Sequence, residues 1–167
     1  SVTDSGKVNL VDPDVQEKRF PTMLIHGGKF IEDTQSNKLN EFALSGSTEI
    51  LGEKYGQIRA MRFKGYTLKV LQDKKNTSIY INRNILTLAT GTDQVTRTNQ
   101  VFSQMKPAKE DWGTINPESV RLHENTLYFL DVNAGKEIRD AGNGQYPISS
   151  YFMNKYFKGV ADRLRQR

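Results

Sequence analysis

The stretch NTLYFLDVNAGKEIR, residues 125–139, decides the fold, because an earlier stretch, YTLKVLQDKKNTSIY at residues 66–80, has the same layout. In each stretch, an apolar run, a polar turn and a second apolar run predict two antiparallel strands. The repetition predicts two copies of an antiparallel meander, which is typical of propeller blades. Six positions match without a gap at a constant offset of 59 residues: Thr67 with Thr126, Leu68 with Leu127, Val70 with Phe129, Leu71 with Leu130, Gln72 with Asp131 and Ile79 with Ile138.

The segments on either side of the two units extend this prediction. QIRAMRF at residues 57–63 adds a strand before the first unit, with KGY as the turn between them. The last segment, SYFMNKYFKGVADRLRQR at 150–167, carries Phe152, Tyr156, Val160 and Leu164 at helical spacing, and a serine at 149 or 150 suits its N-cap. We therefore expect a mainly β protein of antiparallel meanders, two propeller-like repeated units, with a C-terminal amphipathic α-helix.

The chain of 167 residues is expected to hold one β domain with an appendage at each end. Residues 1–22 are polar and contain prolines, which predicts an N-terminal arm or linker. Residues 23–148 are the predicted antiparallel β domain, and 149–167 the predicted helix. Residues 89–115 are rich in Thr, Asn and Gln and are expected to form an inserted loop. Because the sequence starts at Ser1 without a methionine, we expect it to be processed or cut from a longer protein.

Composition excludes several kinds of chemistry. There is no cysteine, so disulfides, thiol nucleophiles and cysteine zinc sites are excluded, and His26 and His123 are the only histidines. No apolar run approaches the roughly 18 residues of a membrane span, and no cofactor is expected. The net charge is +5, with much of the excess in KYFKGVADRLRQR at 155–167. This basic end suits nucleic acid or an acidic partner, or simply a solvated face with favourable charge at a helix C-terminus.

The pattern Asp131-x-Asn133-x-Gly135-x-Glu137 resembles a calcium loop, because alternating carboxylate and amide oxygens are ligands that calcium takes. An EF-hand loop needs Gly at its sixth position and Glu at its twelfth, and this sequence has Lys and Gly there. The corresponding turn of the first unit carries lysines instead of ligands. A turn with Gly135 at positive φ therefore explains the pattern better, and Asp131, Asn133 and Glu137 are kept as calcium candidates only.

Carboxylates and aromatic side chains are the other candidates for catalysis and binding. Glu110, Asp111 and Glu118 could form a carboxylate pair of the kind used in glycoside hydrolysis, but nothing in the sequence fixes their geometry. No Ser, His and Asp constellation is recognisable, so the protein is predicted not to be an enzyme. Trp112 could anchor the inserted loop in a pocket or face a partner. The tyrosines, interleaved with Lys and Arg, could bind single-stranded nucleic acid or sugar, or make cross-strand pairs.

The segment INPESVRLHENTLYFLDVNAGKEIRDAGNGQYPIS, residues 115–149, followed by an aromatic helix containing YFK, is similar to a segment of the structural tail proteins of short-tailed phages. It most resembles the muzzle (tail-nozzle or stabilisation) proteins of crAss-like phages, over about residues 30–158. The positions that carry the resemblance are Asn116 to Ser119, Tyr128 to Asp131, Gly135, Arg139 and Gly142 to Ser149.

This resemblance implies a propeller-like β domain in a ring that closes or extends the DNA exit channel and holds the genome until ejection. It implies no catalysis, a homo-oligomeric ring with other phage tail proteins as partners, and transient contact with genomic DNA. It also implies location in the virion tail after production in the bacterial cytoplasm.

The two predicted blades have edges that need cover, and the predicted function has alternatives. Two blades are too few for a propeller of about 4 to 8, so their edges need cover from further chain, the terminal helix or another subunit. The alternative function is a non-catalytic sugar- or receptor-binding β module that uses Trp112 and the tyrosines, and a hydrolase comes third. The interface candidates are Trp112, Phe152, Tyr156, Lys158, Arg163 and Arg165.

Overall fold

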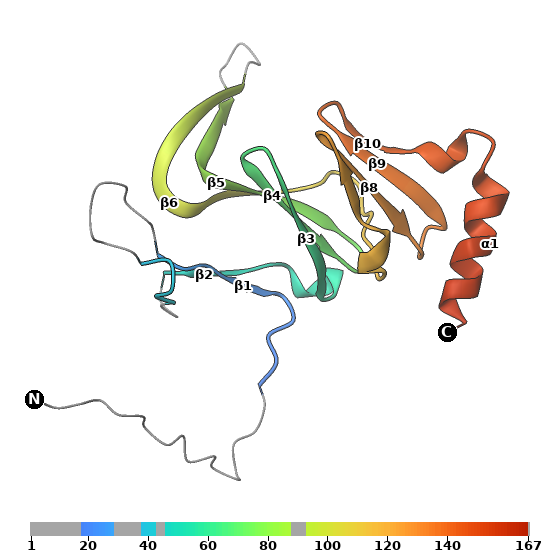
Figure 1. Cartoon of the computed structure of the whole chain (residues 1–167), viewed down its shortest axis with the longest axis horizontal. Helices are drawn as coiled ribbons and strands as arrows, with labels where there is room; N and C mark the ends of the chain where they lie inside the picture. The colour runs from blue at the N-terminus through green and yellow to red at the C-terminus, as the bar shows by residue number, and fades with distance from the viewer. Residues whose placement is uncertain (1–17, 29–37, 43–45, 88–92, 167) are drawn as a thin grey trace, which may run out of the picture.

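The computed structural model describes residues 18–28, 38–42, 46–87 and 93–166, and of residues 83–87 and 93–99 it describes the backbone alone. Within these ranges the protein is mainly β, with antiparallel sheets and one α-helix at the C-terminal end (Figure 1). None of the sheets closes on itself. No described helix is long and apolar enough to cross a membrane.

Two four-stranded antiparallel sheets form the body of the protein, and in both the strands follow one another in chain order. Each sheet is therefore a simple meander, as the repeat predicts. A two-stranded ribbon precedes them and the helix follows them. Sheet 1 contains β3 (Ile58–Lys64), β4 (Thr67–Gln72), β5 (Asn76–Thr87) and β6 (Asp93–Pro107); sheet 2 contains β7 (Arg121–His123), β8 (Thr126–Asp131), β9 (Lys136–Ala141) and β10 (Gly144–Pro147); the ribbon pairs β1 (Met23–Ile25) with β2 (Thr48–Ile50), and the helix is α1 (Asn154–Arg165).

The two sheets pack face to face through a buried apolar cluster. Successive residues of a strand point to opposite faces, so Leu71 faces sheet 2 while its neighbour Val70 faces away. Leu71 and Ala60 of sheet 1 meet Phe129 of sheet 2, and each of these three side chains is buried. The other buried members of this intersheet cluster are Val120, Leu127 and Ile138.

The outer faces of both sheets are covered by different elements. Val70 and Ile79 pack with Leu24 and Leu51, which come from the β1–β2 ribbon and its end. On the other side of the molecule, α1 lies against sheet 2 (Figure 1). The residues of this helix contact are Leu130, Val132 and Ala161, with Ile115, Phe157, Val160 and Leu164 half-buried around them.

The repeat is confirmed as two hairpins, but their strand registers differ by two residues. Leu68 pairs with Ile79, whereas its counterpart Leu127 pairs with Asp140 rather than with Ile138. The second turn lies one residue later in its unit, because Gly135 adopts a φ of 64°. A shift of two keeps every side chain on its original face, so the cores of the two hairpins still correspond.

The expected inserted loop at 89–115 is wrong over most of its length. Residues 93–107 form β6, which pairs with β5, and only the part after Pro107 is a described loop. The many threonines of this segment favour a strand, because a β-branched residue fits a pleated sheet well. Beyond the last pairing of β4 with β5, at Thr67 and Tyr80, β5 and β6 continue alone as a two-stranded arm that curves away from sheet 1 (Figure 1).

The predicted boundaries at the two ends are also corrected. The carbonyl oxygens of Pro21 and Thr22 accept hydrogen bonds from the backbone of Ile58 and Leu51, so the β domain already begins there. The rest of the predicted arm, up to residue 17, lies outside the described residues. The helix begins at Asn154 with Met153 at its N-cap and no side-chain cap. Ser149 instead lies in a short 3-10 helix, Ile148–Ser150, and its Oγ accepts a hydrogen bond from the backbone of Glu137 in β9.

Candidate functional site

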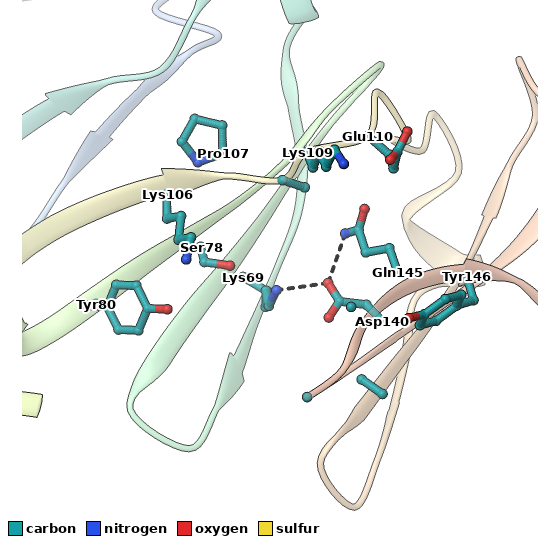
Figure 2. A pocket seen from close by; sticks show the side chains of 14 residues that line it. Lys69, Ser78, Tyr80, Lys106, Pro107, Lys109, Glu110, Asp140, Gln145 and Tyr146 are labelled. Carbon is teal, nitrogen blue, oxygen red and sulfur yellow. Dashed lines mark hydrogen bonds and ion pairs between the residues drawn. The ribbon is translucent and has the colours of Figure 1, made fainter. Parts of the chain in front are cut away.

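A pocket of about 420 Å³ opens between the two sheets (Figure 2). One wall is the inner face of sheet 1, and the other is the β9–β10 hairpin of sheet 2. The segment that follows β6 closes the pocket at one side. Its size falls within the range of roughly 300–1,000 Å³ that is usual for small-molecule sites. The polar side chains that line it are Lys69, Ser78, Tyr80, Lys106, Lys109, Glu110, Asp140, Gln145 and Tyr146.

The sheet 1 wall of the pocket is a basic row across the strands. Lys69 of β4 pairs with Ser78 of β5, and Ser78 pairs with Lys106 of β6. The row continues outward, because Arg62 of β3 pairs with Lys69. Directly opposed residues share one face of a sheet, and like charges placed this close repel each other. This wall therefore needs negative charge from elsewhere.

Asp140 of β9 supplies part of that charge from the opposite wall. Its side chain is nearly fully buried, and Oδ2 accepts hydrogen bonds from Nζ of Lys69 at 2.8 Å and from Nδ2 of Asn76 at 3.0 Å. Lys64 Nζ lies 3.5 Å from Oδ1. Burial opposes ionisation of Asp140, but the charge of Lys69 and the hydrogen bonds from Gln145, Lys69 and Asn76 outweigh it and hold its pKa below the usual value. Asp140 is therefore a buried carboxylate.

Gln145 of β10 completes this network but leaves one acceptor unused. Its Nε2 donates to Oδ2 of Asp140 at 3.0 Å, which fixes the orientation of the amide. The amide oxygen Oε1 is buried and has no donor among the described residues. Figure 2 shows this oxygen turned away from Asp140, toward the segment that carries Lys109 and Glu110. A buried acceptor without a donor is costly, so a group that donates to it would be favoured there.

The rim of the pocket carries positive charge that the described part of the chain does not neutralise. Lys106 and Lys109 are both exposed, and neither forms an ion pair with another described residue. Glu110 stands beside them as the only acidic side chain of the rim. With Lys69 and Asp140 included, the lining holds three basic and two acidic side chains. The pocket therefore favours a ligand with negative charge.

The calcium candidates do not converge on one point. Asp131 and Lys136 are paired, as are Leu130 and Glu137, so Asp131 and Glu137 point to opposite faces of sheet 2. Oδ1 of Asp131 accepts from the backbone of Ala134 at 2.9 Å, and Oδ2 accepts from Gly113 at 3.2 Å. Asp131 therefore holds the turn and the segment that follows β6.

Asn133, the third candidate, is directed elsewhere. Its Nδ2 donates to the backbone oxygen of Asp73, in the turn between β4 and β5, at 3.3 Å. Among the described residues, no three His, Asp or Glu side chains are close enough to hold a metal ion. Asp131, Asn133 and Glu137 therefore do not share one site in this arrangement.

The three carboxylates considered for hydrolysis are also separate. Glu110 lines the pocket between the sheets, and Asp111 lines another hollow, beside Tyr55. A hydrogen bond from Lys75, together with its charge, lowers the pKa of Asp111. Glu118 accepts a hydrogen bond from Nδ2 of Asn116 at 2.8 Å. Glu110, Asp111 and Glu118 therefore do not form a shared acid–base pair.

The predicted interface residues fall into two groups. Trp112 packs against the intersheet cluster, so the anchoring alternative describes its main contact. Arg165 donates to the backbone oxygens of Val132 and Asn133 and to Asp162, so it ties α1 to sheet 2. These contacts were missed because they join segments far apart in the sequence.

The remaining candidates are exposed, as an interface residue must be. The side chain of Phe152 is fully exposed and that of Tyr156 is 59% exposed, whereas the helix packs through Phe157, Val160 and Ala161. The predicted apolar stripe is therefore half wrong, because Phe152 precedes the helix and Tyr156 lies on its outer side. Lys158 and Arg163 are exposed as well, and their role in an interface stays a prediction.

Sequence reasoning missed the pocket. Lys69, Lys106, Asp140 and Gln145 come from segments that only the strand register brings together. One local signal was available, because Lys69 precedes Leu71 by two residues in β4 and so lies on the same face of the strand. No protein-family model matches the chain, and no curated protein is detectably similar to it.

Proposed function

We propose that the protein is a non-catalytic structural module that assembles with further copies of itself through the edges of its sheets. The observation that carries this proposal is the outer edge of β3, a seven-residue strand that pairs only with β4 among the described residues. Its side chains Met61 and Phe63 are 47% and 57% exposed. A long edge strand with exposed apolar side chains is a surface on which a further strand pairs, and proteins that stay monomeric usually protect it.

The curved arm formed by β5 and β6 supports the same proposal. Its outer part, from Arg83 to Thr87 and from Asp93 to Arg97, has only two paired strands among the described residues. A two-stranded hairpin without further packing is at best marginally stable in water. Contact with a neighbouring subunit would stabilise the arm, which curves away from the rest of sheet 1 (Figure 1).

The two meanders are proposed to be a pair of propeller-like blades. Each has the four-stranded up-and-down order of a blade, and the two are packed face to face. Because α1 covers the outer face of sheet 2, a further blade does not stack there. Assembly of several copies through the edges of their sheets is therefore favoured over closure of a propeller within one chain.

Within this proposal the assembly is a ring in the tail nozzle of a short-tailed phage, the family that the sequence resembles, where it helps to retain or release the genome. The chain would then act in the virion tail. Lys155, Lys158 and Arg163 on the exposed side of α1 would make the transient contacts with DNA. Such contacts with phosphates weaken steeply as salt concentration rises.

The experiment is a measurement of the oligomeric state of the full chain by light scattering, with electron microscopy of the larger species. We expect rings or discrete oligomers at micromolar concentration. Phe63→Lys, alone or with Met61→Lys, is expected to shift the population to monomer, because a charged edge resists strand pairing. Gln166→Lys, which adds the same charge at the exposed end of α1, is the matched control and should leave the oligomer intact.

Two results would contradict the proposal. One is a monomer at all concentrations tested. The other is an oligomer that Phe63→Lys and Gln166→Lys leave equally intact, because β3 would then have no part in assembly. Circular dichroism of each variant establishes that a lost oligomer is not a lost fold.

A further inference from the structure

We infer that the pocket between the two sheets binds an acidic saccharide, whose hydroxyl groups contact Gln145 and whose carboxylate lies between Lys106 and Lys109. This inference does not rest on assembly through β3, since no pocket residue lies on that edge strand or on α1. It also moves the predicted sugar-binding function away from Trp112, which packs in the intersheet cluster.

Gln145 presents to the pocket an acceptor that no described residue uses. The amide cannot turn over, because its Nε2 would then leave the carboxylate of Asp140 and Oε1 would face it. Oε1 therefore stays a buried acceptor that requires an N–H or O–H donor. A sugar hydroxyl is such a donor, and it can accept a hydrogen bond at the same time.

The rim of the pocket carries positive charge that is unpaired among the described residues. Lys69 is already paired with Asp140 at 2.8 Å, so it contributes little free charge to a ligand. Lys106 and Lys109 are exposed, and neither is paired with a described residue. Hydrogen bonds from an ammonium group to a carboxylate are among the stronger ones in proteins, because both partners are charged. The two lysines therefore select an anionic group close to the hydroxyl donor.

The combination of a hydroxyl donor and a negative charge distinguishes an acidic saccharide from other anionic ligands. The phosphates of a nucleic acid strand offer acceptors but no donor, so the groups that would pair with the two lysines could not also pair with Gln145. The pocket is an open hollow of about 420 Å³ between the two sheets. Tyr80 adds an aromatic ring to the wall, and Figure 2 shows its hydroxyl directed toward Lys69. One acidic sugar unit supplies the donors, the acceptors and the negative charge together.

The experiment measures binding of the full chain to digalacturonate by isothermal titration calorimetry. Digalactose serves as the neutral counterpart, and inorganic phosphate and a thymidine oligonucleotide serve as other anions. We expect digalacturonate to bind most tightly. Lys106→Gln and Lys109→Gln should each weaken it about tenfold, the loss of one charge-assisted hydrogen bond. Both side chains are exposed, so these substitutions are expected to leave the fold intact.

Two further variants sharpen the test. Gln145→Met keeps the size of the side chain but removes its acceptor, together with the donor to Asp140, so it should weaken digalacturonate and digalactose alike. The double variant Lys38→Gln with Lys74→Gln removes two exposed lysines outside the pocket and should bind as the unchanged protein does. A loss confined to the pocket lysines would thus exclude a general effect of net charge.

Three results would overturn the inference. The first is that digalacturonate binds no more tightly than digalactose. The second is that the pocket lysines and the control lysines have the same effect. The third is that the oligonucleotide or phosphate binds more tightly than either saccharide. A screen of the full chain on an array of acidic and neutral glycans, with no acidic glycan retained, would have the same consequence.

Discussion

The Nζ of Lys69 lies 2.8 Å from Oδ2 of Asp140, and this ion pair joins the inner faces of the two sheets. The side chains are 13% and 3% exposed, so both charges are largely removed from water. A buried charge is tolerated only while its partner and its hydrogen bonds are present. The pair therefore makes the packing of sheet 1 on sheet 2 depend on a polar contact as well as on the apolar cluster.

Asp140→Asn is expected to destabilise the protein strongly. It leaves Lys64 and Lys69 without their carboxylate, and breaking a buried pair typically costs about 3–5 kcal/mol. The free energy of unfolding in urea measures the effect. The control is Asp162→Asn, which removes the exposed pair with Arg165 on α1 and should cost less than about 1 kcal/mol. Equal losses in the two variants would contradict the importance of the intersheet pair.

Glu137 makes stability depend on pH. Burial raises its pKa to about 7, against an ordinary value of 4.5. Between these two values the carboxyl of the folded protein keeps its proton, while that of the unfolded protein has lost it. The contribution of protonated Glu137 to the free energy of unfolding is therefore complete below pH 4.5 and disappears as pH rises to about 7.

Glu137→Gln removes this dependence. We expect the variant to be more stable than the unchanged protein at pH 8, by about 1 kcal/mol, a value reduced because the carboxyl is partly exposed. At pH 4 the difference should vanish. Urea unfolding at both pH values measures it, and a difference that is the same at both would contradict the raised pKa.

Gly113 is a position at which the backbone leaves no room for a side chain. A Cβ there would collide with the carbonyl oxygen of Gln72 and would lie 2.6 Å from the backbone nitrogens of Lys74 and Lys75. Gly113→Ala should therefore lower the melting temperature markedly, by the equivalent of about 2 kcal/mol or more. In contrast, Gly159→Ala on α1 meets open space and should stabilise the helix by about 0.5–1 kcal/mol. Thermal unfolding of both variants tests whether the two substitutions change the stability in opposite directions.

Phe152 combines an unfavourable backbone with an exposed ring. Its φ is 63°, a conformation that costs a bulky residue about 1–3 kcal/mol, and its side chain is fully exposed. We expect Phe152→Gly to raise the free energy of unfolding, because the exposed ring makes no compensating contact with the described residues. If the ring serves an interface, the same variant should assemble less well. Reduced stability in Phe152→Gly would show that the ring is packed.

The parts of the fold that depend on local pattern were predictable. The alternating apolar residues of β4 and β8, the turn at Gly135 and the helical spacing of Val160 and Leu164 are all visible in short windows of sequence. Local signals of this kind predict the existence of an element better than its limits, and α1 accordingly starts later than expected.

The parts of the fold that depend on contacts between distant segments were not predictable from the sequence. The two-residue difference in register follows from which turn closes each hairpin, and β6 is a strand because β5 is long enough to pair with it. The candidate pocket depends on the register that places Lys69, Ser78 and Lys106 in one row opposite Asp140. No window of the sequence contains that row, so no local pattern predicts it.

The position of Trp112 has a practical consequence. It is the chain's one tryptophan, and it packs against the cluster that joins the two sheets. Its fluorescence therefore reports the separation of sheet 1 from sheet 2, while the circular dichroism of α1 reports the outer layer. Comparing the two signals during unfolding would show whether the halves of this repeated protein come apart together or one after the other.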